Sequence, residues 1–451
     1  SKIYDRVMNG TVVDELRIFG LEDADSFVVR GGNSPVKIRV IGGPGKDDFL
    51  NEGDAGRVLV YDVTFEENEF HGNHTQLRKM LSDDPQVNLY NRLWYKYNFV
   101  NPGVTFSYNV DDGLAVGYGV QITRQGFRKE PYGMRHVLWG RRALRTSSLQ
   151  FRYEGDFVKA IGNSDLIIRA DVRAPINVTN FFGLGNETVF NKDHPDRERF
   201  YRSRYNLINA SALLRRQLQS WMRVNYGIGF QHFRLDAEQN KGRFVQMAPG
   251  NGLDPATMYL GKTFIGPELL LDINSRNNMA VPTRGFVMDA GARSLFGLNS
   301  NSSNNLTQLH MDMRIYASFE SKARVVYATR FGVGHNIGRF EFPQAQYLGG
   351  TENLRGYRRD RFAGRTMFFN NTEIRLKIAD FNTYLFPGQI GLLVFNDVGR
   401  VWNEGENSTD WHVGNGAGIW VAPIKRFVIA AMYTRSKEEK FLPLVTFGFQ
   451  F

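Results

Sequence analysis

The chain has 451 residues, enough for one large domain and a small one, and it contains no Cys, which excludes disulfide frameworks and thiolate metal sites. Its uninterrupted apolar stretches are only a few residues long, far short of the roughly 20 residues that a membrane-spanning helix needs. The formal net charge of +10 favours an anionic membrane surface as a partner. We expect no nucleic-acid partner, because the arginines are spread over many predicted strands.

The N-terminal residues contain a repeat of 22 residues. The segment "LRIFGLEDADSF" (16–27) realigns with "IRVIGGPGKDDF" (38–49), and a third apolar strand, "RVLVYD", follows. A repeat of this length with one or two short strands per copy indicates coils of a β-solenoid. We interpret residues 1–63 as a β-solenoid-like segment, the end of a truncated periplasmic region, and the polar residues 64–88 as a linker.

One turn of this repeat is a weak candidate for calcium binding. The segment "GGPGKDDF" (42–49) fits the Gly-Gly-x-Gly-x-Asp turn, in which Asp47 would be a ligand. Calcium in such turns requires stacked copies, and the aligned "GLEDADSF" lacks most of the glycines. A turn between solenoid strands is the favoured interpretation, so we expect no metal site and no cofactor apart from this one candidate.

We interpret residues 89–451 as a second domain, in which apolar and polar residues alternate persistently from about Gly103 onward. In "LTQLHMDMRIYASFE" (306–320), for example, Met311, Met313 and Ile315 alternate with Asp312 and Arg314. A period of two predicts strands whose two faces meet different surroundings. Sixteen strands are predicted, at residues 102–109, 113–124, 134–144, 147–159, 163–174, 199–216, 217–234, 259–273, 284–296, 305–320, 322–336, 366–380, 388–402, 412–422, 425–436 and 442–451.

Three features favour a membrane barrel over a soluble sandwich. The strands are longer than the usual ~5–6 residues of globular strands. The long connections, 175–198, 235–258 and 337–365, all follow odd-numbered strands, while most connections after even-numbered strands are short. The 35 Phe, 19 Tyr and 46 Gly suit a barrel whose lumen face is polar. We predict an all-β fold, a 16-stranded antiparallel transmembrane β-barrel in the cell outer membrane, surrounded by lipid and lipopolysaccharide.

The long connection between strands eleven and twelve is strongly cationic. Its segment "LGGTENLRGYRRDRF" (348–362) carries four arginines. By the parity of their strands, Glu373 and Asp397 point into the lumen, where two carboxylates attract a cation strongly. Arg355 is the natural partner because a guanidinium binds carboxylates bidentately. Gly356 permits a tight turn beside it, and Tyr357 packs. The alternative is an ordinary surface loop whose arginines face water.

These motifs resemble a known family. "LRGY" followed by "FNDVG" looks like the paired motifs of the BamA/TamA/FhaC (bacterial surface antigen) superfamily, and "FFGLGNET" (181–188) and "PTRGF" (282–286) resemble further motifs. "FFGLGNET" points to the subgroup linked to calcineurin-like metallophosphatase domains. The resemblance implies that the loop folds into the lumen. It assigns the loop motif to Leu354, Arg355, Gly356 and Tyr357, and its anchoring to Glu373, Phe395, Asp397 and Gly399.

The resemblance also implies a function without catalysis: assistance in the assembly or translocation of outer-membrane proteins. Members of the family usually carry POTRA domains with a βααββ pattern, and residues 1–86 lack this pattern. The alternative is therefore a non-transporting barrel that anchors a periplasmic enzyme domain or partner subunits. The partners would be outer-membrane protein clients if the barrel assists assembly. They would be periplasmic or lipoprotein subunits if the barrel is an anchor. A diffusion porin fits poorly, because the cationic loop would fill the lumen.

An insertase needs a seam that can open. The first strand, "GVTFSYNV" with Val104 and Phe106, is short and follows Pro102, which donates no ladder hydrogen bond. The last strand, "PLVTFGFQF", places Phe447, Phe449 and Phe451 on one face and ends in an aromatic residue, which suits the assembly signal of outer-membrane barrels. We predict that these two strands meet through few hydrogen bonds.

Overall fold

The structure is a computed structural model that describes residues 3–32, 34–53, 58–72, 77–247, 253–302, 305–424 and 426–451. The chain divides into two units, Ser1–Tyr97 and Asn98–Phe451, and each is described by itself. Within the described ranges, no helix has the length and apolarity needed to cross a membrane.

The first unit consists of two small parallel sheets. One contains β1 (Glu15–Phe19), β3 (Lys37–Ile41), β5 (Val58–Val63) and β7 (Leu77–Ser82), and the other contains β2 (Ser26–Val29), β4 (Asp48–Asn51) and β6 (Glu69–Gly72). In both sheets the first pairing has an offset of 22 residues, for example Leu16 opposite Ile38. The sequence repeat is therefore the coil of a solenoid, with one strand of each sheet per coil.

The core of the solenoid corrects the prediction for residues 64–88. Phe27, Phe49 and Phe70 stack in successive coils, with ring centroids 5.2 and 5.3 Å apart. Phe70 and the buried Leu77 thus complete the core from within the predicted linker. That interpretation is wrong for β6 and β7, because each presents a single apolar side chain to the core, Phe70 and Leu77, while the other residues of these strands are polar or, like Met80 and Leu81, exposed. The helical turns η1 (Pro85–Asn88) and η2 (Arg92–Trp94) follow.

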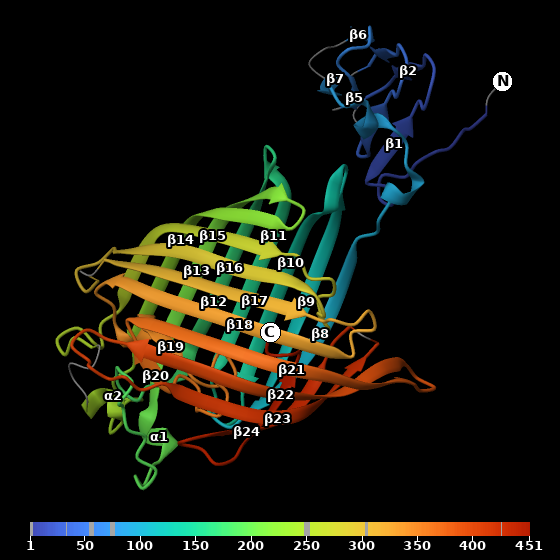
Figure 1. The fold of residues 1–451 in the computed structure, drawn as a ribbon. Helices are drawn as coiled ribbons and strands as arrows, with labels where there is room; N and C mark the ends of the chain where they lie inside the picture. The colour runs from blue at the N-terminus through green and yellow to red at the C-terminus, as the bar shows by residue number, and fades with distance from the viewer. Residues whose placement is uncertain are drawn as a thin grey trace. The chain divides into compact units, whose positions relative to one another are not determined.

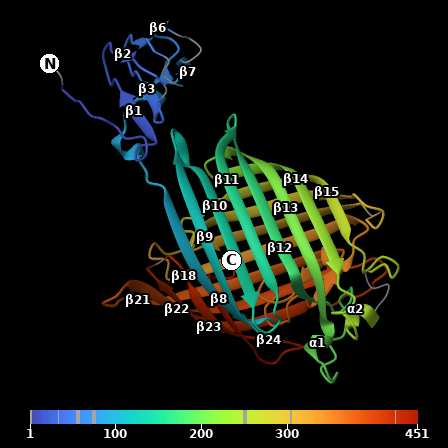
Figure 2. The same ribbon diagram turned by 180° about the vertical axis from the view of Figure 1, so that it is seen from behind.

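The second unit is a closed antiparallel barrel of sixteen strands, which confirms the predicted fold class (Figures 1 and 2). Its strands are β8 (Phe99–Asn109), β9 (Gly113–Gly126), β10 (Lys129–Ala143), β11 (Leu149–Ile161), β12 (Ser164–Asn180), β13 (Arg202–Gln219), β14 (Met222–Leu235), β15 (Lys262–Asn274), β16 (Gly285–Gly297), β17 (Leu306–Ala317), β18 (Val325–Gly338), β21 (Thr366–Asn382), β22 (Pro387–Trp402), β23 (His412–Pro423), β24 (Ile429–Ser436) and β25 (Leu442–Phe447).

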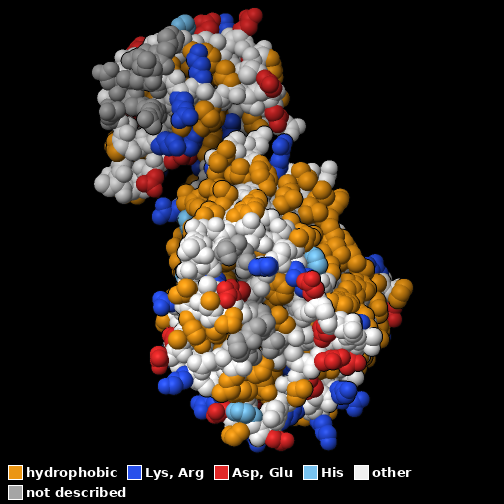
Figure 3. Space-filling model, turned by 90° about the vertical axis from the view of Figure 1, so that its left-hand side faces the viewer, with side chains coloured by type: hydrophobic (Ala, Val, Ile, Leu, Met, Phe, Trp, Pro, Cys, Tyr) orange, Lys and Arg blue, Asp and Glu red, His pale blue; other side chains and the backbone are white. Residues whose placement is uncertain are grey.

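The outer face of the barrel wall is apolar and the inner face is polar, as expected for a wall that faces lipid. On β17, Met311 and Ile315 are exposed outside, while Asp312 and Arg314 pair with each other at 2.8 Å on the lumen side. Figure 3 shows hydrophobic side chains gathered along the flank of the barrel and charged side chains scattered over the end that faces the viewer. An apolar exterior around a polar, ion-paired interior is the pattern of a transmembrane barrel.

The long connections fold back against the inner wall. They carry α1 (Glu198–Tyr201), α2 (Phe244–Met247), η3 (Phe342–Gln344) and a small two-stranded sheet of β19 (Gln346–Leu348) and β20 (Phe362–Gly364). Phe181 and Phe342 from two of these connections pack with Phe233 and Phe264 of the wall in one buried cluster. This packing places the arginine-rich segment between β19 and β20 inside the barrel.

Two predicted strand boundaries are wrong at the ends of the barrel. The first strand, β8, starts at Phe99 and has 11 residues, with Pro102 in its interior. The last strand, β25, has six residues and ends at Phe447. Gly448 then takes a φ of +101°, a conformation that favours glycine, and donates a hydrogen bond to the Val428 carbonyl. The following residues leave the wall and enter the barrel.

The exterior placement of Ile315 gives a first test. Ile315→Arg puts a guanidinium against acyl chains and should cost roughly 2–4 kcal/mol of folding free energy if the site is near the midplane. Phe319→Arg is the control, because Phe319 is 96% exposed in the turn that follows β17, where the cost should be near zero. Urea titrations of the full chain in lipid vesicles measure both values. Equal costs would contradict the lipid-facing assignment.

Candidate functional site

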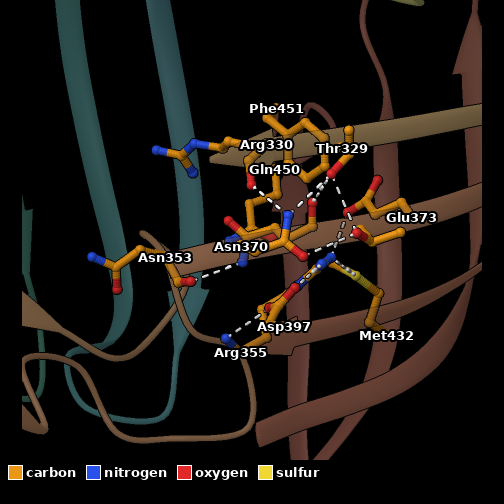
Figure 4. A network of polar contacts seen from close by, with 12 residues as sticks. Thr329, Arg330, Asn353, Arg355, Asn370, Glu373, Asp397, Met432, Gln450 and Phe451 are labelled. Atoms are coloured by element: carbon orange, nitrogen blue, oxygen red, sulfur yellow. Dashed lines mark hydrogen bonds and ion pairs between the residues drawn. The ribbon is translucent and has the colours of Figure 1, made fainter. Parts of the chain in front are cut away.

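Arg355 lies at the centre of a buried ionic network. Its guanidinium binds both carboxylate oxygens of Asp397, with Nε and Nη2 each 2.7 Å from an oxygen, and Nη1 donates to Glu373 Oε1 at 2.5 Å. The Arg355 backbone N–H also donates to Asp397 at 3.0 Å. The cation lies 3.5 Å from the ring centroid of Phe395. Figure 4 shows Arg355 surrounded by Asp397, Glu373 and Met432.

Glycines give the loop backbone room to approach the wall. Gly356 has a φ of +89°, and a Cβ there would lie 2.6 Å from the Arg435 carbonyl oxygen. A Cβ on Gly414 would lie 1.7 Å from the carbonyl oxygen of Arg355, and one on Gly399 would meet Leu348 at 2.9 Å. Sequence reasoning included Gly356 and Gly399 but did not identify Gly414, whose role depends on a contact between distant segments.

Apolar side chains seal the network. Leu354 and Tyr357 are buried in a cluster with four other side chains, Leu348, Phe362, Phe369 and Val401. The Tyr357 ring meets Phe362 edge-on, with centroids 5.4 Å apart. The structure thus brings the four residues of the loop motif together with Glu373, Phe395, Asp397 and Gly399 of β21 and β22.

A second arginine, which sequence reasoning missed, extends the network to the end of the chain. Arg375 donates to Glu373 Oε2 at 2.7 Å and to the Phe451 carbonyl oxygen at 2.7 Å. Its cation lies 3.9 Å from the ring centroid of Phe449. Glu373 therefore links the loop motif to residues 448–451. The parity of β21 places Arg375 on the lumen side, but no pattern pairs it with Phe451.

The last and first strands of the barrel share little backbone pairing, and we call their junction the seam. In the described residues β25 and β8 share one registered pair, Val445 and Tyr108, whereas β8 and β9 share eleven. Val104, Phe106 and Phe447 are exposed on the outer face. Phe449 and Phe451 do not share that face, contrary to the sequence prediction, because the turn at Gly448 directs Phe449 onto Trp420 and buries Phe451 beside Tyr316.

Asp47 has a structural role within the solenoid. Its Oδ1 accepts the backbone N–H of Asp25 at 2.8 Å, and its own N–H donates to Asn68 Oδ1 at 2.8 Å. Asp25, Asp47 and Asn68 occupy equivalent positions in successive coils, so their side chains join the coils. No three His, Cys, Asp or Glu side chains among the residues that the structure describes are grouped to hold a metal ion.

The comparison with known families agrees with the motif. A model of the Omp85 superfamily domain matches residues 53–451. No curated protein matches the chain.

Solved structures of similar fold exist. BamA from Haemophilus ducreyi lacking POTRA domains 1–3 is 14% identical with a TM-score of 0.57, and the match covers 78% of this chain and 70% of that chain. CdiB from Escherichia coli is 11% identical with a TM-score of 0.49, and CdiB from Acinetobacter baumannii is 15% identical with a TM-score of 0.48. Those matches cover 83% and 78% of this chain, and 65% and 59% of the respective CdiB chains.

The network makes Arg355 a determinant of barrel stability. Arg355→Ala would leave the buried Asp397 without its cation and Glu373 with Arg375 alone, and breaking a buried pair commonly costs ~3–5 kcal/mol. We expect lower unfolding midpoints in urea and faster proteolysis within residues 337–365. Arg339→Ala is the matched control, because Arg339 is an exposed arginine of the same connection. Equal stability of the two variants would contradict the role of Arg355.

The solenoid gives a prediction that depends on pH. Burial, and next the charge of Asp47, raise the pKa of Asp62 to about 7. Between pH ~4 and that value the folded state holds a proton that the unfolded state has released, so stability falls as pH rises. Asp62→Asn should therefore protect the full chain from proteolysis within residues 37–63 more at pH 8 than at pH 5. The exposed Glu22→Gln control should show no such difference.

Proposed function

The chain belongs to the Omp85 superfamily, and we propose that its barrel assists the assembly or translocation of outer-membrane proteins. An Omp85 barrel of sixteen strands lies in the bacterial outer membrane, and barrels of this superfamily are generally transport and assembly proteins without enzymatic activity. The observation that carries the proposal is the seam, where a single registered pair joins β25 to β8 in the described part of the chain. We also propose that this chain has no enzymatic activity.

The chemistry of the seam supports this role. An unpaired strand edge presents backbone N–H and C=O groups that pair readily with another strand. Among the residues that the structure describes, only Tyr108 of β8 is paired with β25, so the edge of residues 99–107 is available to the strand of a client. Addition of such a strand supplies backbone hydrogen bonds to any sequence. Lipid or lipopolysaccharide would surround this edge, and outer-membrane protein clients would be its partners.

A second function is favoured by a different observation. The unit Ser1–Tyr97 is a solenoid, whereas POTRA domains would be expected to receive client chains. The loop motif and residues 448–451 also occupy the lumen. The barrel would then be an anchor without transport. Its partners would be a periplasmic enzyme, such as the metallophosphatase domain of the resembling subgroup, or periplasmic or lipoprotein subunits.

A disulfide that locks the seam distinguishes between the two proposed functions. Tyr108→Cys with Val445→Cys places two thiols at the one registered pair in a chain without Cys. In vesicles that contain the full chain, oxidation should stop the insertion of an unfolded outer-membrane protein, and reduction should restore it. The control is Ala212→Cys with Ile228→Cys, a registered, outward-facing pair within a continuous hairpin. Undiminished insertion by the oxidised seam variant would favour the anchor.

A further inference from the structure

Three arginines of the loop lie outside the Arg355 network. Arg358, Arg359 and Arg361 follow the motif directly and contact the two turns that flank the seam. The turn at residues 110–112 joins β8 to β9, and the turn at residues 437–441 joins β24 to β25. Each turn contributes two neighbouring carboxylates, Asp111 and Asp112 on the first-strand side, Glu438 and Glu439 on the last-strand side.

Arg359 is paired with the first-strand side. Its Nη1 donates to Asp112, and its backbone N–H donates to Asp111 Oδ2 at 2.9 Å. Asp111 and Asp112 are buried although they lie in a turn. Hydrogen bonds between ionised groups are roughly twice as strong as those between neutral groups. Arg359 therefore holds the first hairpin to the loop.

Arg361 is paired with the last-strand side. Nε and Nη2 each bind a carboxylate oxygen of Glu438, at 2.8 and 2.7 Å. The Arg361 side chain is 1% exposed and stacks on Phe182 and Phe362. A bidentate pair in such surroundings fixes both the distance and the orientation of its partners. Arg361 therefore holds the last hairpin to the same loop.

Arg358 contacts both sides. Its Nη1 lies 3.6 Å from Asp111 Oδ1, and its Nε donates to Glu439 Oε1 at 3.2 Å. A third contact, from Nη2 to Glu198 at 2.8 Å, ties it to the connection that contains α1. One guanidinium thus spans the two turns that flank the seam.

We propose that Arg358, Arg359 and Arg361 form an ionic staple that positions the two strands of the seam and sets how readily they separate. The staple lies at the end of the seam where Tyr108 and Val445 pair, because Tyr108 and Leu442 to Val445 adjoin the two turns in sequence. Because so little backbone pairing joins β25 to β8, the ion pairs of the staple are what hold the two strands together. The inference rests on the proposed function only for its consequence, the control of client entry.

The test measures the seam without a client. Leu114 of β9 and Ala431 of β24 are exposed on the outer face, each opposite one member of the seam pair. Their backbones are three strand spacings apart, about 14 Å. Spin labels on Leu114→Cys and Ala431→Cys in the full chain report this separation by pulsed electron resonance.

Charge exchange is the sharpest variant. Arg361→Glu should raise the population with longer label distances by roughly three- to tenfold, in the range expected for loss of a partly buried ion pair. The double variant Arg361→Glu with Glu438→Arg should return the population towards the wild-type value. Arg358→Ala should resemble Arg361→Glu, and Arg339→Ala, an exposed arginine of the same connection, should not.

Salt provides a test that needs no substitution in the staple. The longer-distance population of the otherwise unaltered chain should rise between 0.05 and 1 M salt, concentrations that shorten the Debye length from above ~10 Å to about 3 Å. Distances unchanged by salt and by Arg358→Ala would overturn the staple. Lengthened distances together with undiminished client insertion by the locked seam would support the staple and contradict the insertase function.

Discussion

The barrel interior depends on one buried cation, the guanidinium of Arg355. Asp397 and Glu373 lie on adjacent strands and are almost completely buried, and two ionised carboxylates in such surroundings are costly without a cation. Arg355 supplies that cation with three charged hydrogen bonds and a contact to Phe395. Because the cation belongs to a loop, satisfying the wall requires the loop to lie inside the barrel. The glycines at 356, 399 and 414 are a consequence of that close approach.

Both ends of the seam are affected by where this loop lies. At the rim, the arginines that follow the motif reach the turns on either side of the seam. Deeper in the barrel, Glu373 shares its second oxygen with Arg375, which holds the Phe451 carbonyl. Residues 448–451 thus place hydrogen-bonding groups in the lumen that would otherwise be able to extend β25 along β8. The short seam and the occupied lumen are two results of one arrangement.

The sequence predicts the wall better than what lies within it. A period of two identifies sixteen strands and the lumen-facing parity of Glu373 and Asp397, because alternation follows directly from strand geometry. The links from Arg375 to Phe451 and from Arg358 to the two turns join residues distant in sequence, and no local pattern encodes them. The solenoid coil at residues 64–82 was missed because only Phe70 and Leu77 mark its core. The departure of the chain from the wall rests on a single glycine, Gly448.

A seam that is held by ion pairs differs physically from one that is held by the backbone hydrogen bonds of a strand ladder. A ladder is stabilised by many backbone bonds that depend little on salt or on side-chain identity, as in the eleven registered pairs of β8 and β9. Ion pairs at a rim weaken when counter-ions screen them and when a carboxylate is protonated. The remaining strand pairs can therefore keep the barrel folded while the seam alone responds to its surroundings. The proposed staple would separate the stability of the fold from the stability of the seam.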